Sequence, residues 1–336
     1  MFTELSTRNI LLIWALFFLI CFGLGYPTLN RYDPAKLPGS SDAQAYGNIV
    51  TGAKVPPVDI SHRVLVPWVA RPFYWLARGR VGSWNPVLFA MLVANSVFTA
   101  STAAAIVVIG LQCGLSYVTS LVGAMLFLFN FAIPNMNLAA YVDSGEAFFL
   151  AMITWSLLAG RWFLLPIWAI PGSLSKETFA PFAVTFSVIW WLTDRPFRAA
   201  RLIWILGLVF FAFGTVWLAL SATRGSSFGP LDFAAEMNRY SEVGFIKALL
   251  RCVTAREFWY VFVWLLPLGL LGLNRIDRSW SLATAATSIL ALLFGAYNDA
   301  LGNTARALFN IAAPLLSLAA SVQLTGLTRQ SAPPHP

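Results

Sequence analysis

The sequence predicts an all-α polytopic membrane protein with about ten transmembrane helices, in the range of nine to eleven. Of the 336 residues, 58% are apolar and only 11% are charged, whereas a soluble domain has roughly 45–50% apolar and 25% charged residues. Several apolar runs approach the roughly 20 residues that a helix needs to cross the hydrocarbon layer. Their apolar residues do not alternate with polar ones as in porin strands. Helices therefore account for the spans.

Cuts at charges, prolines and glycines divide the chain into ten candidate spans. They cover residues 9–29, 86–110, 116–133, 144–160, 162–171, 179–193, 202–221, 259–273, 280–296 and 305–322. The first is expected to be retained, because it has no Ala-x-Ala cleavage site and its apolar run is long. The fifth is too short to span unaided and contains Pro166, so a broken or tilted helix is expected there. Residues 1–325 are expected to form one transmembrane domain, and 326–336 a disordered tail.

Lysine and arginine in short loops predict the orientation of these spans. The two clearest basic short loops, around Arg198 and Arg275, are separated by two spans and so lie on one face, which we assign to the cytoplasm. Arg161 joins them if 162–193 forms a hairpin. The remaining polar segments then all lie on the outer face: the first outer loop 30–85, the segment 134–146, the turn 173–178, the second large outer loop 222–258 and the turn 298–306.

The net charge of +8 does not indicate a nucleic-acid partner, because the chain has no soluble basic domain. Anionic membrane lipid, or an anionic lipid substrate, accounts for it instead. The three cysteines, Cys21, Cys113 and Cys252, are odd in number and scattered. They predict neither a disulfide framework nor a zinc site.

An interfacial helix is predicted over residues 62–78 of the first outer loop. Arg63, Arg71 and Arg78 fall within an arc of roughly 80° at 100° per residue, and four aromatic residues supply anchors for the headgroup level. Two prolines exclude one straight helix. The aromatic residues are Trp68, Phe73, Tyr74 and Trp75, and the prolines are Pro67 and Pro72. A membrane-hugging loop without further function is the alternative.

Asp42 is the first candidate for chemistry. It follows two serines and precedes Tyr46 by four residues, so an N-cap at Ser40 or Ser41 places its carboxylate at the start of a helix. That position favours the ionised form that a general base needs. The alternative is a solvated capping acid.

Asp143, Glu146 and Lys176 stand at the outer ends of predicted spans. Acids at membrane depth are costly and tend to be functional, although a capping Asp followed by a first-turn Glu is also ordinary at an interface. An ammonium on a turn that faces a cavity suits a phosphate. The alternative for Lys176 is a local surface pair with Glu177.

Three further polar residues belong to the same predicted face. Asp299 and Arg306 both stand just before the last span, and Arg306 either snorkels to the headgroups or reaches a lipid phosphate. His62 precedes Arg63 and either moves a proton, donates to phosphate or has only a structural role.

Five short stretches occur in an order that resembles the small bacterial members of the GT-C superfamily of integral-membrane glycosyltransferases. They are "SDAQAY", "HRVLVPWVARP", "YVDSGEAFFLAM", "SLSKETFAPFAV" and "TARALFNIAAPLL". The resemblance implies a GT-C-like fold in the bacterial inner membrane, with the active site facing the periplasm. It also implies an inverting transfer of a sugar from a polyprenyl phosphate to a glycolipid, polysaccharide or other cell-envelope acceptor.

The resemblance also implies roles for individual residues. Asp42 is the expected catalytic base, while Lys176 and Arg63 or Arg306 are expected to hold the donor phosphate, with Arg71 presented by the interfacial helix. The acceptor or sugar pocket is expected to include Asp143, Glu146, Tyr46, His62 and Asp299.

The chain departs from the larger relatives in one respect. They carry Asp-Glu or Asp-x-Asp in the first loop, whereas "SSDAQ" has a single acid. The base is therefore open among Asp42, Asp33 and Asp59. No cofactor is expected: a divalent metal is possible but is not indicated, because it needs two or more nearby carboxylates. Two other classes stay open: a transporter or flippase of an anionic lipid-linked substrate, and a non-catalytic membrane assembly subunit.

Overall fold

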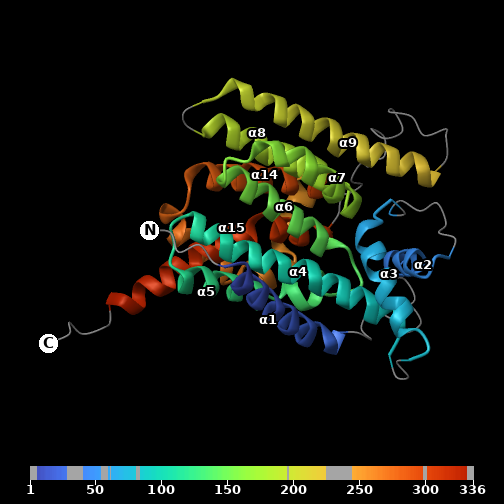
Figure 1. Ribbon diagram of the computed structural model, residues 1–336. Helices are drawn as coiled ribbons and strands as arrows, with labels where there is room; N and C mark the ends of the chain where they lie inside the picture. Colours follow the sequence, from blue (N-terminus) through green and yellow to red (C-terminus); the bar gives the residue numbers. More distant parts are fainter. Residues whose placement is uncertain are drawn as a thin grey trace.

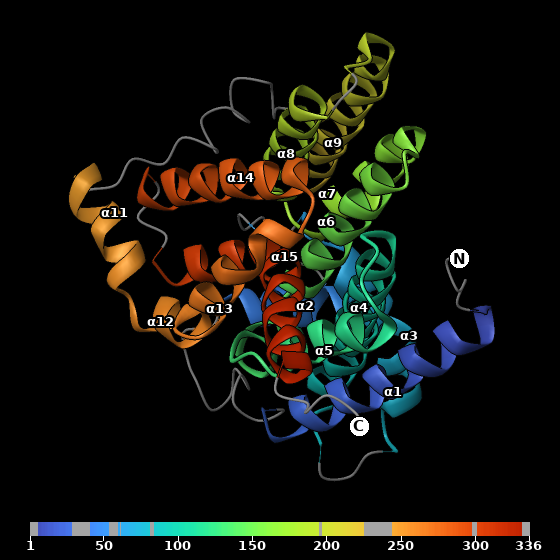
Figure 2. The same cartoon turned by 90° about the vertical axis from the view of Figure 1, so that its left-hand side faces the viewer.

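The computed structural model describes residues 6–28, 41–53, 60, 62–80, 84–194, 197–224, 244–297 and 301–330, and these residues contain helices and no strand. The α-helices are α1 (Thr7–Gly25), α2 (Ser41–Thr51), α3 (Leu65–Ala77), α4 (Pro86–Gln112), α5 (Tyr117–Leu128), α6 (Asp143–Leu158), α7 (Leu165–Ser175), α8 (Phe179–Thr193), α9 (Leu202–Arg224), α11 (Phe245–Thr254), α12 (Arg256–Phe262), α13 (Leu265–Gly272), α14 (Arg278–Tyr297) and α15 (Leu301–Gln330). Short helical turns are η1 (Tyr26–Thr28), η2 (Ile133–Asn137), η3 (Trp162–Leu164), η4 (Ala199–Arg201) and η5 (Leu273–Arg275). Figure 1 shows α2 and α3 at one end of the bundle, and Figure 2 shows α11 and α12 on the side away from α1.

Polar side chains start several of the apolar helices. Asn85 caps α4, where its side-chain oxygen accepts from the backbone N–H groups of Val87 at 2.9 Å and Leu88 at 3.3 Å. Pro86 then occupies the first helical position, where its missing N–H costs nothing. Ser116 caps α5 in the same way by accepting from Thr119 N–H at 3.1 Å. These caps satisfy backbone donors that lipid cannot satisfy.

Five of the described helices are long and apolar enough to cross a membrane: Thr7–Gly25, Pro86–Gln112, Ala199–Thr223, Arg278–Tyr297 and Thr304–Gly326. The pair Arg256–Phe262 and Leu265–Arg275 forms a sixth if it counts as one span, although it bends by 44°. The chain is therefore a multi-pass α-helical membrane protein by the length and composition of its helices.

All ten predicted spans coincide with helices, but several of these helices are short. Tyr117–Leu128, Trp162–Ser175 and Phe179–Thr193 have 10–17 residues, and a helix rises only about 1.5 Å per residue. The ten-span topology therefore stays a prediction. The segment 162–171 starts with the short turn η3, which runs directly into α7, so the broken or tilted helix predicted there stays a prediction. Helix α15 continues to Gln330, and residues 331–336 of the predicted disordered tail lie outside the described residues.

Residues Leu65–Ala77 of the segment 62–78, predicted to be an interfacial helix, form α3, and its position at a membrane surface stays a prediction. Its aromatic anchors Trp68 and Trp75 are 50% and 57% exposed, as expected for side chains that face lipid headgroups. Pro67 lies in the first turn, where proline is tolerated, and the helix continues through Pro72. The kink that the two prolines predict in this helix stays a prediction.

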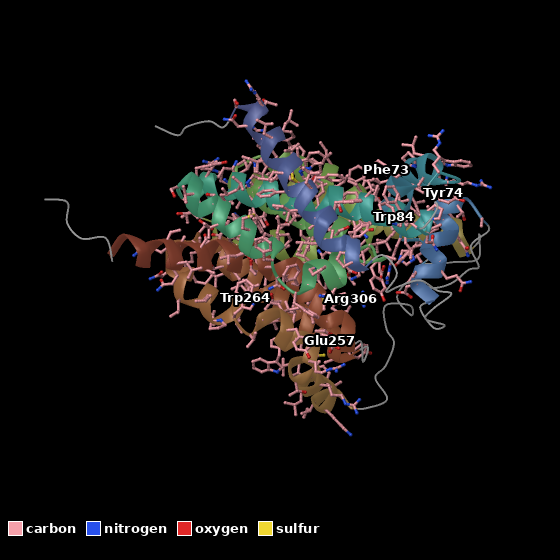
Figure 3. The ribbon with its side chains drawn as sticks, turned by 90° about the horizontal axis from the view of Figure 1, so that it is seen from below. Phe73, Tyr74, Trp84, Glu257, Trp264 and Arg306 are labelled. Carbon is pink, nitrogen blue, oxygen red and sulfur yellow. The ribbon has the colours of Figure 1, made fainter. Side chains whose placement is uncertain are left out.

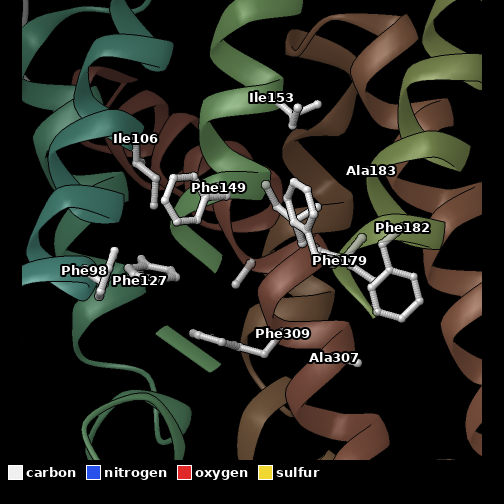
Figure 4. Packing of buried hydrophobic residues seen from close by; sticks show 14 of the residues in the cluster. Phe98, Ile106, Phe127, Phe149, Ile153, Phe179, Phe182, Ala183, Ala307 and Phe309 are labelled. Carbon is white, nitrogen blue, oxygen red and sulfur yellow. The ribbon is translucent and has the colours of Figure 1, made fainter. Parts of the chain in front are cut away.

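The core is built from aromatic and small side chains. Phe127 and Phe309 stack with ring centroids 5.3 Å apart between α5 and α15. Figure 4 shows these rings together with Phe98, Phe149 and Phe179 inside the bundle. Small residues permit close helix contacts in lipid. A Cβ on Gly272 of α13 would lie 2.0 Å from the carbonyl oxygen of Ala319, so these two helices touch through their backbones.

Candidate functional site

Four segments that are distant in the sequence meet at one end of the bundle. Hydrogen bonds join the α2–α3 region to the α7–α8 connection, and the α7–α8 connection to the start of α6. A further bond joins the start of α6 to the start of α15. These are segments that the predicted topology assigns to one face. Which side of the membrane that face occupies stays a prediction.

Asp143 is the centre of a buried ion cluster that it forms with Glu146, Lys176 and Arg306. Its Oδ1 accepts from Lys176 Nζ at 2.7 Å, and its Oδ2 accepts from Arg306 Nη1 at 3.3 Å. Lys176 Nζ also lies 3.6 Å from Glu146 Oε2. Asp143 is 3% exposed, Lys176 7% and Glu146 0%. The alternative interpretation of Lys176 as one half of a surface pair with Glu177 is therefore wrong.

Glu146 has its hydrogen bonds satisfied by neutral neighbours. Thr178 Oγ1 donates to Oε1, and Asn310 Nδ2 donates to Oε2 at 2.8 Å. The same Asn310 amide donates to the backbone oxygen of Asp143 at 3.2 Å. Because Glu146 is fully enclosed by these groups, it does not line an open acceptor pocket in this structure. It anchors α8 and α15 to the first turn of α6.

Glu177 forms a second group of contacts, with residues of the segment between α1 and α4. Its carboxylate accepts from both Nε and Nη2 of Arg63, and the Nε contact is 2.7 Å long. His62 Nε2 lies 2.9 Å from Glu177 Oε2. Arg63 Nη1 donates to the hydroxyl oxygen of Tyr46 at 3.3 Å. A two-pronged arginine–carboxylate pair of this kind fixes both position and orientation.

The backbone conformation at Lys176 explains why the adjacent side chains of Lys176 and Glu177 contact different partners. Lys176 ends α7 in an extended conformation, with φ −164° and ψ 138°. Successive side chains of an extended chain point to opposite sides. Lys176 therefore points to α6, while Glu177 points to His62 and Arg63.

Asn95 of α4 positions the turn that leads to Asp143. Its Nδ2 donates to the carbonyl oxygens of Ala139 and Tyr141, the second at 3.1 Å. Its Oδ1 accepts from Ser144 Oγ at 2.6 Å. The guanidinium of Arg306 lies 4.6 Å above the ring of Tyr141, and Figure 3 labels Arg306 on α15. The turn therefore holds both Asp143 and its guanidinium partner.

Gly145 permits the close approach of three elements at this point. A Cβ there would lie 2.7 Å from Ser175 Oγ and 2.9 Å from Val66 Cγ2. We expect Gly145→Ala to destabilise the protein by about 1–3 kcal/mol, the usual cost of overpacking. Unfolding in mixed detergent micelles measures this. Gly214→Ala is the matched control, because nothing lies within 4 Å of its Cβ position on α9, and it is expected to be neutral or slightly stabilising. Equal effects would contradict the tight fit.

The ionised forms of the site are mutually stabilising. Burial alone raises the pKa of the Glu177 carboxyl, but Arg63 and His62 outweigh burial and hold it well below its usual range. Burial alone lowers the pKa of Lys176, but Asp143 and Glu146 outweigh it and raise that pKa. Burial raises the pKa of Tyr46 to about 12, so its hydroxyl stays neutral.

The low pKa of Glu177 predicts how stability depends on pH. Since this carboxyl ionises more readily in the folded than in the unfolded state, its contribution is present above the unfolded pKa of about 4.3 and is lost as pH falls through the folded pKa. We expect the difference in unfolding free energy between wild type and Glu177→Gln to be largest near neutral pH and to shrink below about pH 4. Unfolding measured from pH 7 to pH 3 tests this. The exposed Glu257→Gln is the control, and a constant difference for Glu177→Gln would count against the assignment.

The structure places the other predicted residues as follows. Asp42 lies in the first turn of α2 and is partly buried, and its charge acts on Tyr46 one turn later. Arg71 is directed to α2, where Nη2 donates to the backbone oxygen of Ile49 at 2.7 Å. That contact gives Arg71 a structural role at the last turn of α2. Asp33, Asp59 and Asp299 lie outside the residues that the structure describes, as does an N-cap at Ser40.

Four residues of the site were not predicted from the sequence as members of it: Asn95, Glu177, Thr178 and Asn310. Asn310 had a recognisable signal, because it follows Arg306 by four residues and so shares its helix face. Thr178 and Glu177 flank Lys176 in "SLSKETF". Asn95 had no such signal, because it lies in the middle of an apolar span.

Comparisons of the chain with protein-family models, with curated proteins and with solved structures found no match. The functional assignment therefore depends on the site itself. Within the described ranges, no group of three or more His, Cys, Asp or Glu side chains is arranged to hold a metal ion. The three carboxylates of the site instead contact the cations Lys176, Arg63 and Arg306.

Proposed function

We propose that this protein is an inverting glycosyltransferase of the GT-C type that takes its sugar from a polyprenyl phosphate. The observation that carries the proposal is the meeting of Arg63, Lys176 and Arg306 with the Asp42 region at one end of an apolar helical bundle. An inverting transfer without a covalent intermediate needs a base on the acceptor side of the sugar. It also needs positive charge on the leaving-group side.

The donor phosphate is assigned to the two guanidinium groups at the rim of the site. The side chains of Arg63 and Arg306 are 17% and 19% exposed, whereas Lys176 is 9% exposed and lies behind them against Asp143. One guanidinium group can bind two oxygens of a phosphate at once. The 3.3 Å contact of Arg306 with Asp143 is long for a charge-assisted bond, whereas that of Lys176 is 2.7 Å, so we assign the Arg306 contact to exchange for a phosphate. Lys176 supports the departing phosphate through its charge.

The acceptor side is assigned to Asp42 as proton acceptor, with Tyr46 and Asp143 next to it. The Tyr46 hydroxyl is neutral and already accepts from Arg63, so it links the two sides of the reaction centre. A hydrophobic route to this centre runs along α3, whose Trp68, Trp75 and Leu76 are exposed. A polyprenyl chain in the bilayer would lie against that surface. The acceptor is then a glycolipid, polysaccharide or other envelope glycan on the outer face of a bacterial inner membrane.

The charge balance of the site favours one other function, that of a non-catalytic assembly subunit. Asp143, Glu146 and Glu177 are matched by Lys176, Arg63 and Arg306. Balanced ion networks also occur where their only role is structural. A transporter is less well supported, because the ion cluster lies at one end of the bundle rather than midway along several spans.

Mass spectrometry of the cell's glycolipids and surface polysaccharides, with and without the gene, tests the proposal. The glycosyltransferase predicts that one glycan loses a sugar and that a polyprenyl-phosphate sugar accumulates. A matched test uses purified protein in lipid nanodiscs with a panel of synthetic polyprenyl-phosphate sugars, and expects release of polyprenyl phosphate when acceptor extract is added. An unchanged glycan profile together with no donor consumption would instead support the assembly subunit.

A further inference from the structure

A small cavity lies inside the bundle, below the ion cluster. It is lined by residues of α6, α8, α14 and α15, among them Thr154, Phe186, Thr287, Asn310 and Pro314. The space open to the centre of a water-sized molecule is about 10 Å³, close to the roughly 10–15 Å³ that one buried water needs. All five are buried, and Thr154, Phe186, Thr287 and Asn310 are at most 5% exposed.

The orientation of the Asn310 side chain is fixed by its two acceptors. Its amide nitrogen faces Glu146 Oε2 at 2.8 Å and the backbone oxygen of Asp143 at 3.2 Å. The backbone oxygen of Asp143 can only accept, so the amide cannot be flipped. Its oxygen is therefore on the other side, and this buried Oδ1 has no hydrogen-bond partner. A buried unpaired amide oxygen is costly.

Pro314 adds a second acceptor at the same place. Proline has no backbone N–H, so the carbonyl of Asn310 lacks the donor that residue 314 would supply in a regular helix. Pro314 and Asn310 both line the cavity. The hydroxyls of Thr154 and Thr287 each donate to a carbonyl in the preceding turn, at 3.0 Å and 2.8 Å, and so present lone pairs to this space.

We propose that the cavity is a binding site for one ordered water molecule, which donates to Oδ1 and to the backbone oxygen of Asn310. A water is the ligand that matches this arrangement, because it brings two donors to a small space bordered by acceptors. A sodium ion is disfavoured, because no carboxylate lines the cavity and the neighbouring charges of Asp143, Glu146, Lys176 and Arg306 already balance.

The water gives Asn310 a positioning role. Because the water donates to its Oδ1, the amide nitrogen of Asn310 stays directed at Glu146 and at the first turn of α6. The water therefore links the membrane-embedded part of α15 to the ion cluster. This inference does not depend on the proposed glycosyltransferase activity.

Radiolytic footprinting in ¹⁸O-labelled water tests the site in the full-length protein. Phe186 lines the cavity, whereas Phe182, on the same helix and also buried at 2% exposure, is not one of its lining residues. We expect Phe186 to be hydroxylated several-fold more than Phe182, because a bound water is a local source of hydroxyl radicals. Equal labelling of the two rings in wild type would overturn the proposal.

Two variants distinguish a water bound in the cavity from general access of solvent to the bundle interior. Pro314→Ala restores an N–H that can donate to the Asn310 carbonyl, and Thr287→Val removes a hydroxyl at nearly constant volume. Both should lower Phe186 labelling to the Phe182 level, whereas Pro171→Ala in α7, away from the cavity, should not. Labelling that persists in both variants would count against the site. A thermal midpoint that rises in sodium over choline chloride, and does so only with Thr287 intact, would assign the cavity to a cation and overturn the water.

Discussion

Lys176→Met is expected to destabilise the protein by about 3–5 kcal/mol, the usual cost of removing one partner of a buried ion pair. The methionine fills nearly the same volume but leaves the carboxylates of Asp143 and Glu146 without their shared ammonium. Arg306 compensates only in part, because its contact with Asp143 is 3.3 Å long, compared with 2.7 Å for Lys176. Unfolding in mixed detergent micelles at neutral pH measures the effect.

A matched control and a double variant make this prediction specific. Arg256 and Glu257 form an exposed pair at 3.9 Å, with side chains 81% and 40% exposed, and Figure 3 labels Glu257. Arg256→Met should change stability by no more than about 1 kcal/mol. Adding Asp143→Asn to Lys176→Met should recover stability, with a coupling of about 0.5–3 kcal/mol. A loss below about 1 kcal/mol for Lys176→Met would show that the ammonium is better solvated than the structure indicates.

The sequence predicted the general location of the site because membrane topology is encoded locally. Each apolar run and each basic loop can be read without knowing its neighbours in space, and counting spans assigns Arg63, Asp143, Lys176 and Arg306 to one face. The contacts between them in the structure agree with this count. Span number is less certain from sequence, because short helices such as Tyr117–Leu128 are apolar enough for lipid but not long enough to cross it.

The pairing of charges inside the site could not be predicted in the same way. Lys176 and Glu177 are adjacent, which favours a local pair, but the extended backbone at Lys176 directs the two side chains to different partners. Glu146 was assigned to a pocket, yet Asn310 and Thr178 enclose it from two other helices. Such contacts depend on how helices pack, and a single sequence carries no signal for packing between segments 164 residues apart.

The predicted arc of arginines failed in part for a related reason. Arg63 precedes α3 rather than lying on it, since the helix starts at Leu65. Its guanidinium is held by Glu177 and Tyr46, and Arg71 on the helix turns to the carbonyl of Ile49. The predicted arc assumed that the helix includes residue 63, and the helix in the structure does not.

Asp42→Asn is expected to lower the turnover number of sugar transfer by about 10²–10⁴-fold, the usual contribution of a general base. Asparagine keeps the size of the side chain in the first turn of α2, so the fold and the binding of a polyprenyl phosphate should persist. The KM for the lipid donor should change little, because the phosphate is assigned to Arg63 and Arg306 rather than to Asp42.

Asp194→Asn is the control for this variant, because Asp194 pairs with Arg201 in a loop that the topology assigns to the opposite face and should leave turnover unchanged. Asp33→Asn and Asp59→Asn, measured in parallel, decide among the three first-loop acids. The base should also produce an acidic limb in the pH profile of kcat/KM, which disappears in the variant that removes it. Turnover within about twofold of wild type for Asp42→Asn would exclude this residue as the base, since loss of a general base costs at least about 10²-fold. A loss in Asp59→Asn alone would assign the proton transfer to that residue instead, and would leave the guanidinium side of the site as proposed.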